Sequence, residues 1–573
     1  MELISGLRTP LLAAIAFAAT IGRAPAQQPM ARASVDSAGA EADFGGGHPA
    51  LSADGRTVAF SSGASTLVPG DTNGAVDVFV HDRMSGATVR VSVDSAGQEA
   101  NSGSIGATLS ADGRFVAFTS IASDLVPNDT NGVADAFVHD RDPDGNGLFD
   151  EGNGVTTRVS VDSNGNQANS WTFDVSISGD GSRVAFSSTA SNLVAGDSNG
   201  TSDVFCRDLV RGKTVRASVD STGGQVSRPS FSPALSGDGN FVAFYSDAPD
   251  LVVGDTNQLE DVFRHDLTTG ATIRVSGDAA GGDADGASFS GAGALSADGS
   301  LVVFESLADD LVANDFNGFR DVFVRDVGGG TTIRVSLGPG GTEGNGDSFE
   351  SAISGDGHVV GFSTVADSFG ARDLGYRADC YVRDLALGTT ELVSRDFTAS
   401  SGDGESRRAA IDATGVAVVF DSVATDLVAD DGNSWVDVFV FDRSIVPLQG
   451  AWTNYGAGHA GTLGVPGLTL TADPEFGATF SLQVDNSAGQ WTVAFLAVGT
   501  TQASLPLAGG MLLVLPLQVL PFGLPPSGFP ISCTVPYDNA LFGFVLDVQA
   551  IEMDPGASQG LSFTPGLELV FGQ

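Results

Sequence analysis

Hydrophobic and polar positions repeat along most of the chain in one twelve-residue pattern, best seen in LSADGRFVAFTS from Leu109. A small or aliphatic pair precedes an Asp-Gly turn, and an apolar run ending in Phe follows it. Seven copies occur, 56 to 68 residues apart, with the central Asp at 54, 112, 180, 238, 298, 356 and 412. Self-similarity at this period is typical of repeat architectures.

Each repeat continues with a run like DVFVHD and, in most copies, a run like TxRVSVD. Short β-branched and aromatic runs separated by Gly, Asp and Asn turns predict strands. Four strands per unit, around LS, VAF, DVFV and RVSV, are typical of a propeller blade. The pattern therefore predicts an all-β chain that forms a seven-bladed β-propeller.

The seventh unit ends at Asp442 and Arg443 without an RVSV strand, whereas Ala31–Asp36 stands alone before the first unit. We expect this N-terminal strand to complete the last blade, which would close the ring and remove exposed sheet edges.

Composition changes at both ends of the repeats. Residues 1–26 carry Arg8, a short apolar run and Ala24-Pro25-Ala26, which predicts a signal peptide. From 444 to 573 there is no Lys or Arg, and alternating runs such as 480–484 favour a β-sandwich. The predicted domains are thus a signal peptide (1–26), the propeller (27–443) and a C-terminal β-sandwich (444–573).

At the SADGRFVAF and DVFVHD runs the chain resembles the TolB-like, WD40-like propeller repeats of secreted and periplasmic bacterial proteins, over roughly residues 31 to 443. The C-terminal part resembles β modules attached to many secreted bacterial proteins. The first resemblance implies a propeller fold; it implies little about function, because this repeat serves binding, scaffolding and enzyme-appendage roles.

The chain is strongly acidic, with 70 Asp and Glu against 27 Lys and Arg, and only one lysine, Lys213. Such a surface repels nucleic acid and anionic membranes and favours cations. No stretch after the leader is apolar and long enough to span a bilayer.

A DxNxxxD pattern recurs in the long loops between the second and third predicted strands. Carboxylate and amide oxygens at alternate positions of a tight turn suit Ca²⁺, but they also suit Asx turns that cap their own backbone. The candidate calcium ligands are Asp71, Asn73, Asp77, Asp129, Asn131, Asp135, Asp197, Asn199, Asp203, Asp255, Asn257, Asp261, Asp315, Asn317, Asp321, Asp431, Asn433 and Asp437. The sixth unit keeps Asp373 and Asp379 but has Gly375 between them.

A sharper calcium candidate is the ten-residue insertion of the second unit. Its residues match positions 1, 3, 5, 7 and 9 of an EF-hand-type loop, with Asn153 in place of the bidentate Glu at position 12. Either Glu151 compensates for this change or the affinity for calcium is weaker. It is similar to the calcium loops of dockerin-like and thrombospondin-like repeats. The candidate ligands are Asp142, Asp144, Asn146, the Leu148 carbonyl, Asp150 and Glu151.

Catalytic signals are weak. His81, His139 and His265 recur at equivalent positions of different blades, while His48, His358 and His459 do not repeat. Two GxSxG matches, at Ser198 and Ser558, lack the strand-to-helix turn of a nucleophile elbow.

The sequence thus favours an exported, calcium-binding propeller that acts as a non-catalytic binding or scaffold protein for an unknown protein or carbohydrate. We expect a monomer that is secreted, extracellular or at the cell surface, with the periplasm as an alternative. A polysaccharide lyase or hydrolase with a site in the central channel, and a structural cell-surface component, stay open. Convergent His, Glu and Arg groups in the channel would favour the enzyme.

Overall fold

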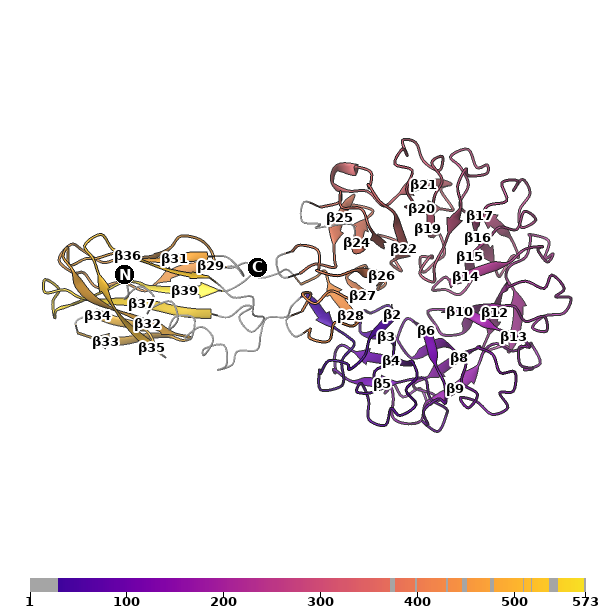
Figure 1. Ribbon diagram of the computed structural model, residues 1–573, viewed down its shortest axis with the longest axis horizontal. Coiled ribbons are helices and arrows are strands. Elements are labelled where there is room, and N and C mark those ends of the chain that lie inside the picture. The colour runs from indigo at the N-terminus through magenta and orange to yellow at the C-terminus, as the bar shows by residue number, and fades with distance from the viewer. Residues whose placement is uncertain are drawn as a thin grey trace. The chain divides into compact units, whose positions relative to one another are not determined.

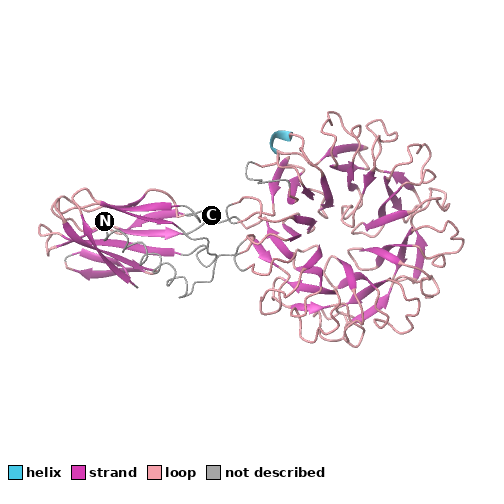
Figure 2. Cartoon of the chain, in the orientation of Figure 1, coloured by secondary structure: helices cyan, strands magenta, loops and turns pink. Residues whose placement is uncertain are grey.

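The computed structural model describes residues 29–370, 377–396, 399–428, 431–445, 451–474, 479–508, 510–516, 518–534 and 545–570. The predicted signal peptide, Asp373 and Gly375 lie outside these residues. The chain divides into two compact units, one over residues 30–444 and one that includes 445–573. Strands dominate both units, and the described helix is a single turn, Pro339–Gly341 (Figure 2). None of the described helices is long and apolar enough to cross a membrane.

Unit 30–444 holds seven antiparallel sheets of four strands each, counted over its described residues. The first three sheets in chain order are β2 (Gly46–Leu51), β3 (Thr57–Ser62), β4 (Asp77–Asp82) and β5 (Thr88–Arg90); β6 (Ser104–Leu109), β7 (Phe115–Ser120), β8 (Asp135–Asp140) and β9 (Val155–Arg158); and β10 (Thr172–Ile177), β11 (Arg183–Ser188), β12 (Asp203–Asp208) and β13 (Lys213–Arg216). The next three are β14 (Ser230–Leu235), β15 (Phe241–Ser246), β16 (Asp261–Asp266) and β17 (Thr272–Arg274); β18 (Ser288–Phe289), β19 (Leu301–Ser306), β20 (Asp321–Asp326) and β21 (Thr331–Arg334); and β22 (Ser348–Ile353), β23 (Val359–Thr364), β24 (Asp379–Asp384) and β25 (Thr389–Leu392).

The seventh sheet joins the two ends of this unit. It consists of β26 (Ser406–Ile411), β27 (Ala417–Ser422), β28 (Asp437–Asp442) and the N-terminal β1 (Met30–Arg32). β1 pairs antiparallel with β28, with Ala31 opposite Val440. The N-terminal strand therefore occupies the fourth position of the last sheet.

The seven sheets surround a common centre, and the labelled first strands β2, β6, β10, β14, β22 and β26 lie nearest to it (Figure 1). This is a β-propeller-type fold, and the all-β prediction with four-stranded repeat units is confirmed.

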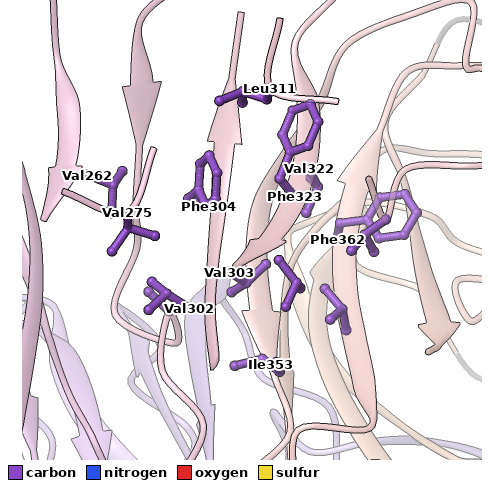
Figure 3. Close-up of a cluster of buried hydrophobic side chains, with 14 of the residues drawn as sticks. Val262, Val275, Val302, Val303, Phe304, Leu311, Val322, Phe323, Ile353 and Phe362 are labelled. Carbon is purple, nitrogen blue, oxygen red and sulfur yellow. The ribbon is translucent and has the colours of Figure 1, made fainter. Parts of the chain in front are cut away.

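The repeated apolar run explains why each unit folds this way. Its Phe pairs across the second and third strands with another aromatic ring, as Phe304 does with Phe323 at 5.7 Å between ring centroids. Both rings are fully buried. Side chains of neighbouring sheets interlock around them, for example Val262 and Val302 (Figure 3). Burial of such a side chain stabilises the fold by about 1.5–3 kcal/mol.

Unit 445–573 is also made of antiparallel strands. The largest sheet contains β29 (Ala451–Tyr455), β39 (Gly566–Val570), β37 (Val545–Met553), β32 (Thr492–Gly499) and β35 (Gln518–Leu524), with β38 (Leu561–Phe563) paired to β37. The smaller sheets are β30 (Leu468–Leu470), β31 (Thr479–Val484) and β36 (Phe529–Thr534), and β33 (Gln502–Leu507) with β34 (Gly510–Val514). The largest sheet and the three-stranded sheet contribute to one hydrophobic core, which includes Phe480, Leu496 and Leu546.

Candidate functional site

The six DxNxxxD loops share one hydrogen-bonding scheme. In every loop the Asn Oδ1 accepts the backbone N–H two residues further on, as from Ala75 to Asn73 at 2.6 Å. The last Asp begins the third strand, where its Oδ1 accepts a hydrogen bond from the hydroxyl of a buried Ser two residues beyond the end of the fourth strand, as from Ser92 to Asp77 at 2.5 Å. These contacts are Asx turns and strand ties, and they use part of the oxygen set that a cation would need.

A buried arginine that is not part of the DxNxxxD pattern lies against each loop. The fourth-strand Arg places its guanidinium between 2.8 and 3.9 Å from both carboxylates of the loop. We call each Asp, Asn, Asp and Arg set a loop cluster; the arginines are Arg32, Arg90, Arg158, Arg216, Arg274 and Arg334. Their side chains are only 7–9 % exposed.

The sequence did carry a signal for this arginine. In the sixth unit, Leu392 stands opposite Tyr381 at the position where the other fourth strands have Arg opposite Phe. That same unit has Gly375 in place of the loop Asn. The arginine and the asparagine are therefore lost together within one chain, which indicates that they act as one cluster.

A further side chain completes each cluster, and its charge differs between repeats. In the second and third loops it is Gln167 or Gln225, whose amide donates to the first Asp of the loop at 2.8 and 3.0 Å. In the other four it is a carboxylate on the same arginine: Glu41, Glu99, Asp283 or Glu343. The groups Glu41, Asp431, Asp437 and Asp71, Asp77, Glu99 bring three carboxylates within 4.8 Å of one another.

Because three carboxylates share one guanidinium in these four clusters, their charge is not balanced. Burial raises the pKa of Asp71 to about 6 against the opposing charge of Arg90, and it does the same for Asp315 beside Arg334. Calcium binding at these loops stays a prediction, and a bound cation would have to share the carboxylates with the arginine.

The fourth loop differs from the others. Arg274 donates to Asp283 through a short hydrogen bond, and Asp283 also accepts the Thr256 hydroxyl at 2.6 Å. Asp255 is left without a hydrogen-bond partner on either carboxylate oxygen, although its side chain is only 2 % exposed. Its nearest guanidinium nitrogen is 3.9 Å away. An unpaired buried carboxylate is costly unless a cation or proton compensates it.

The EF-like insertion lies between β8 and β9, and its side-chain oxygens accept hydrogen bonds from backbone N–H groups of the same loop. Both Asp142 oxygens accept backbone N–H groups, from Asn146 at 3.0 Å and Gly147 at 2.9 Å. Asn146 Oδ1 accepts the Leu148 N–H, and Asn146 Nδ2 donates to Glu151 at 2.7 Å. This brings Asp142, Asp144, Asn146 and Glu151 into one turn.

Asp150 is held outside that turn. Both of its oxygens accept from the Arg141 guanidinium, at 3.0 and 2.5 Å. A calcium ion in this loop would have to compete with Arg141 for the position 9 ligand. The site stays a prediction that rests on the remaining oxygens.

The three repeated histidines have a structural role. Nδ1 of His81, His139 and His265 lies 2.9 Å from a fourth-strand Thr hydroxyl, which itself donates to a carbonyl of the preceding repeat. Burial lowers their pKa, to about 4 for His139. They are buried ties between repeats and not metal ligands of one site.

The non-repeating His48 belongs to a different arrangement, on the inner strands. Six of the seven first strands carry a register shift at the same point, for example between Gly47 and Ala50 in β2. The residue there has a positive φ: 54° at His48, 52° at Glu350 and 56° at Arg408. The equivalent in β6 is Gly106, the residue type that adopts this conformation without strain.

These three residues lie on β2, β22 and β26, which belong to consecutive sheets around the ring, and Asp421 of β27 joins them. Asp421 Oδ2 accepts from Arg408 Nη1 at 3.0 Å and from the His48 backbone N–H at 3.1 Å. Glu350 accepts the Arg408 N–H at 3.3 Å and lies 3.8 Å from its guanidinium. We call His48, Glu350, Arg408 and Asp421 the inner-strand cluster.

The cluster has one guanidinium and two carboxylates: Arg408 lies between Glu350 and Asp421, so its charge is paired and one negative charge is left over. Partial burial and the Arg408 charge lower the pKa of His48. A side chain at position 47 would crowd this cluster, because a Cβ at Gly47 would lie 2.9 Å from Asp421 Oδ2.

Aromatic side chains occupy the neighbouring ring positions. In four consecutive sheets the first strand has a Phe at the position equivalent to Gly47 of β2: Phe173, Phe231, Phe289 and Phe349. Phe231 contacts Tyr245 at 5.7 Å, and Arg407 lies over Phe349 at 5.2 Å. Beside them, Glu305 is buried, pairs with Arg320 at 3.7 Å, and has a pKa raised by burial to about 7.

The C-terminal unit brings together two residues that looked unrelated in the sequence. His459 Nε2 lies 3.0 Å from Ser558 Oγ, within the second GxSxG match. The nearby acid Asp554 is bonded to Thr462 instead of to the imidazole. An exposed Ser-His pair without an orienting carboxylate lacks the third member of a triad.

No family model and no curated protein matches the chain. Solved structures with a similar fold include a putative TolB from Agrobacterium tumefaciens, at 15 % identity and a TM-score of 0.30 over 51 % of this chain and 80 % of that one. A second is the periplasmic gluconolactonase PpgL of Pseudomonas aeruginosa, at 18 % identity and 0.29 over 60 % and 82 %. A prolyl endopeptidase matches at 12 % identity and 0.39 over 85 % of this chain and 59 % of that one. These likenesses concern the fold.

Proposed function

We propose that this chain is an exported, calcium-binding, seven-bladed β-propeller with a C-terminal β-sandwich, and that it acts as a non-catalytic binding or scaffold protein. Seven four-stranded sheets, with β1 completing the last, support the architecture. The leader-like residues 1–26 support export. The contacts of Arg408 with both Glu350 and Asp421 support a binding role, because they leave none of the three as a free acid or base.

Buried Asp255, which lacks a hydrogen-bond partner on both oxygens, carries the calcium proposal. Burial raises its pKa, and the neighbouring charges of Asp283, Asp247 and Asp250 add to this against Arg274. A divalent cation with oxygen ligands would neutralise this charge and supply the missing contacts. The EF-like loop is a second place to test.

The test is calorimetric titration with Ca²⁺, and thermal unfolding with and without a chelator. Binding to the native state alone stabilises by about 2.7 kcal/mol at a hundredfold excess over Kd. We expect Asp255→Asn to remove the part of the shift due to the fourth loop, and Asp142→Asn to remove the part due to the EF-like loop.

Asp197→Asn is the matched control, because the Gln225 amide already donates to Asp197. It should leave the calcium-dependent shift unchanged. An unfolding temperature that changes with neither Ca²⁺ nor chelator would refute calcium binding. That result would not test the propeller fold or its binding role.

One observation favours the enzyme alternative: His48, Glu350 and Arg408 come from three sheets to one place. A lyase or hydrolase working there would release reducing ends or unsaturated products from a polysaccharide. The assay is sustained turnover of neutral and anionic glycans, with Glu350→Gln as the control variant. Turnover that disappears in this variant would replace the non-catalytic proposal.

A further inference from the structure

The inner-strand cluster has a feature that packing alone does not require. Glu350, Arg408 and His48 hold a positive φ at one equivalent ring position, where Gly106 shows that glycine suffices. Strained backbone at chemically active side chains is a feature of ligand sites. The loop clusters, in contrast, repeat one residue set in six loops.

The chemistry of the cluster indicates what it would bind. Its acceptors and donors are fixed by their mutual contacts: Asp421 holds Arg408 and the His48 N–H, and Ser363 lies 3.4 Å from Glu350. A polar surface whose guanidinium is already paired hydrogen-bonds to hydroxyl groups well, and its surplus carboxylate repels an anionic ligand.

Access to solvent is sufficient for such a ligand. The Arg408 side chain is 41 % exposed and that of Glu350 is 30 % exposed. The cluster is thus a partly open surface next to the centre of the ring and not a closed ion pair.

The same ring position supplies apolar faces. Phe173 is 40 % exposed, and the equivalent Phe231, Phe289 and Phe349 are partly exposed. In Figure 1 the first strands β10 and β14 lie across the centre of the ring from β2 and β26. A ligand with both hydroxyl groups and flat C–H faces can contact both sets. A net charge of −43 disfavours a polyanionic ligand.

We propose that the inner-strand cluster and the phenylalanines of the same ring position form a binding site for a neutral oligosaccharide. This inference rests on the proposed function, because it names the ligand class of a non-catalytic binding propeller. Glu350, Arg408 and His48 hydrogen-bond to sugar hydroxyls, and Phe173 and Phe231 stack on sugar rings.

The test uses the full mature chain at constant Ca²⁺ and calorimetric titration with defined hexasaccharides: neutral gluco-, manno- and xylo-oligosaccharides, an oligogalacturonate and a chitosan oligomer. We expect at least one neutral ligand to bind more tightly than the chitosan oligomer, and the oligogalacturonate to bind at least tenfold more weakly than that neutral ligand.

Glycine variants separate binding from folding. Glu350→Gly and Arg408→Gly should weaken binding at least tenfold. The unfolding temperature of Glu350→Gly should fall little, since glycine relieves the positive φ, whereas Arg408→Gly also leaves the buried Asp421 without its guanidinium and should be less stable. Gln258→Gly is the matched control: it relieves a φ of 59° in a loop whose equivalents are Gly74 and Gly132, and it should leave affinity within twofold.

Each outcome decides the proposal. No binding of a neutral hexasaccharide, tighter binding of a charged one, or unchanged affinity in both glycine variants would overturn it. If Ca²⁺ still stabilises the chain in that case, the broader function stands and only the ligand class is wrong. Turnover of a bound neutral ligand would keep the site and overturn the non-catalytic role.

Discussion

The loop clusters and the inner-strand cluster use similar residues in opposite ways. Six loop clusters repeat the same Asp, Asn and Arg, bury them, and tie the third strand to the fourth. The inner ring position has a different residue in almost every sheet, including His48, Gly106, Ser232, Glu350 and Arg408. Residues that every repeat needs are those that make the repeat fold, so a position that varies between repeats is free to serve a ligand.

The largest expected effect comes from removing a loop-cluster arginine. Arg334→Met leaves Asp315, Asp321 and Glu343 without their cation, and loss of one partner of a buried ion pair costs about 3–5 kcal/mol. We expect this loss at pH 7 in urea unfolding, and a smaller one at pH 5, where the carboxyls take up protons.

The control is Arg211→Met, which removes an exposed ion pair with Asp208. Exposed pairs contribute about 0–1 kcal/mol. An equal, small loss in both variants would mean that the loop clusters do not stabilise the fold, and the comparison would fail.

An intermediate effect concerns pH. Burial raises the pKa of Asp71, Asp261, Asp315 and Asp431 to about 6, above the unfolded value of 3.8. The native state therefore binds more protons in this range, so the stability that these groups contribute is full below about pH 3.8 and is lost as pH rises through about 6.

Other carboxyls, such as Glu99, have a lowered pKa, and their contribution to stability rises with pH instead. The effect of one group is therefore measured by comparing a variant with the wild type. We expect Asp315→Asn to reduce the loss of unfolding free energy between pH 4.5 and 7.5. The exposed Glu405→Gln should leave this slope unchanged. Identical slopes in all three proteins would contradict the prediction.

The smallest expected effect is at the inner ring position itself. Gly106→Ser should cost about 1 kcal/mol, because its φ is 70° while the nearest atom to a new Cβ is 3.9 Å away. Ser232→Gly should be neutral or stabilise by up to about 1 kcal/mol, because φ at Ser232 is 49°.

Thermal unfolding of both variants would check whether serine at this position is less stable than glycine in both strands. If Ser232→Gly destabilises as much as Gly106→Ser, the positive φ at this position carries no strain, and the residues of the inner-strand cluster need no functional reason.

Much of the fold could be predicted because its signals are local. VAF-like and DVFV-like runs recur in each repeat, and an Asp-Gly turn precedes them in six of the seven. The two runs pair as neighbouring strands, so Phe304 meets Phe323 within one unit. The DxNxxxD loops could be identified for the same reason. Their arginine was missed because it comes from the next strand, 13 residues after the last Asp in most units.

The sequence by itself therefore determined the all-β repeat unit and the acidic loops, because these depend on residues close together along the chain. The tertiary structure decided that a fourth-strand arginine faces the loop carboxylates and that His459 meets Ser558. It also decided that His48, Glu350, Arg408 and Asp421 form one cluster. His48 and Asp421 are 373 positions apart, and only the ring of sheets and the register shifts of β2, β22 and β26 bring the inner-strand cluster together. His459 and Ser558 are 99 positions apart and meet through the fold of the C-terminal unit.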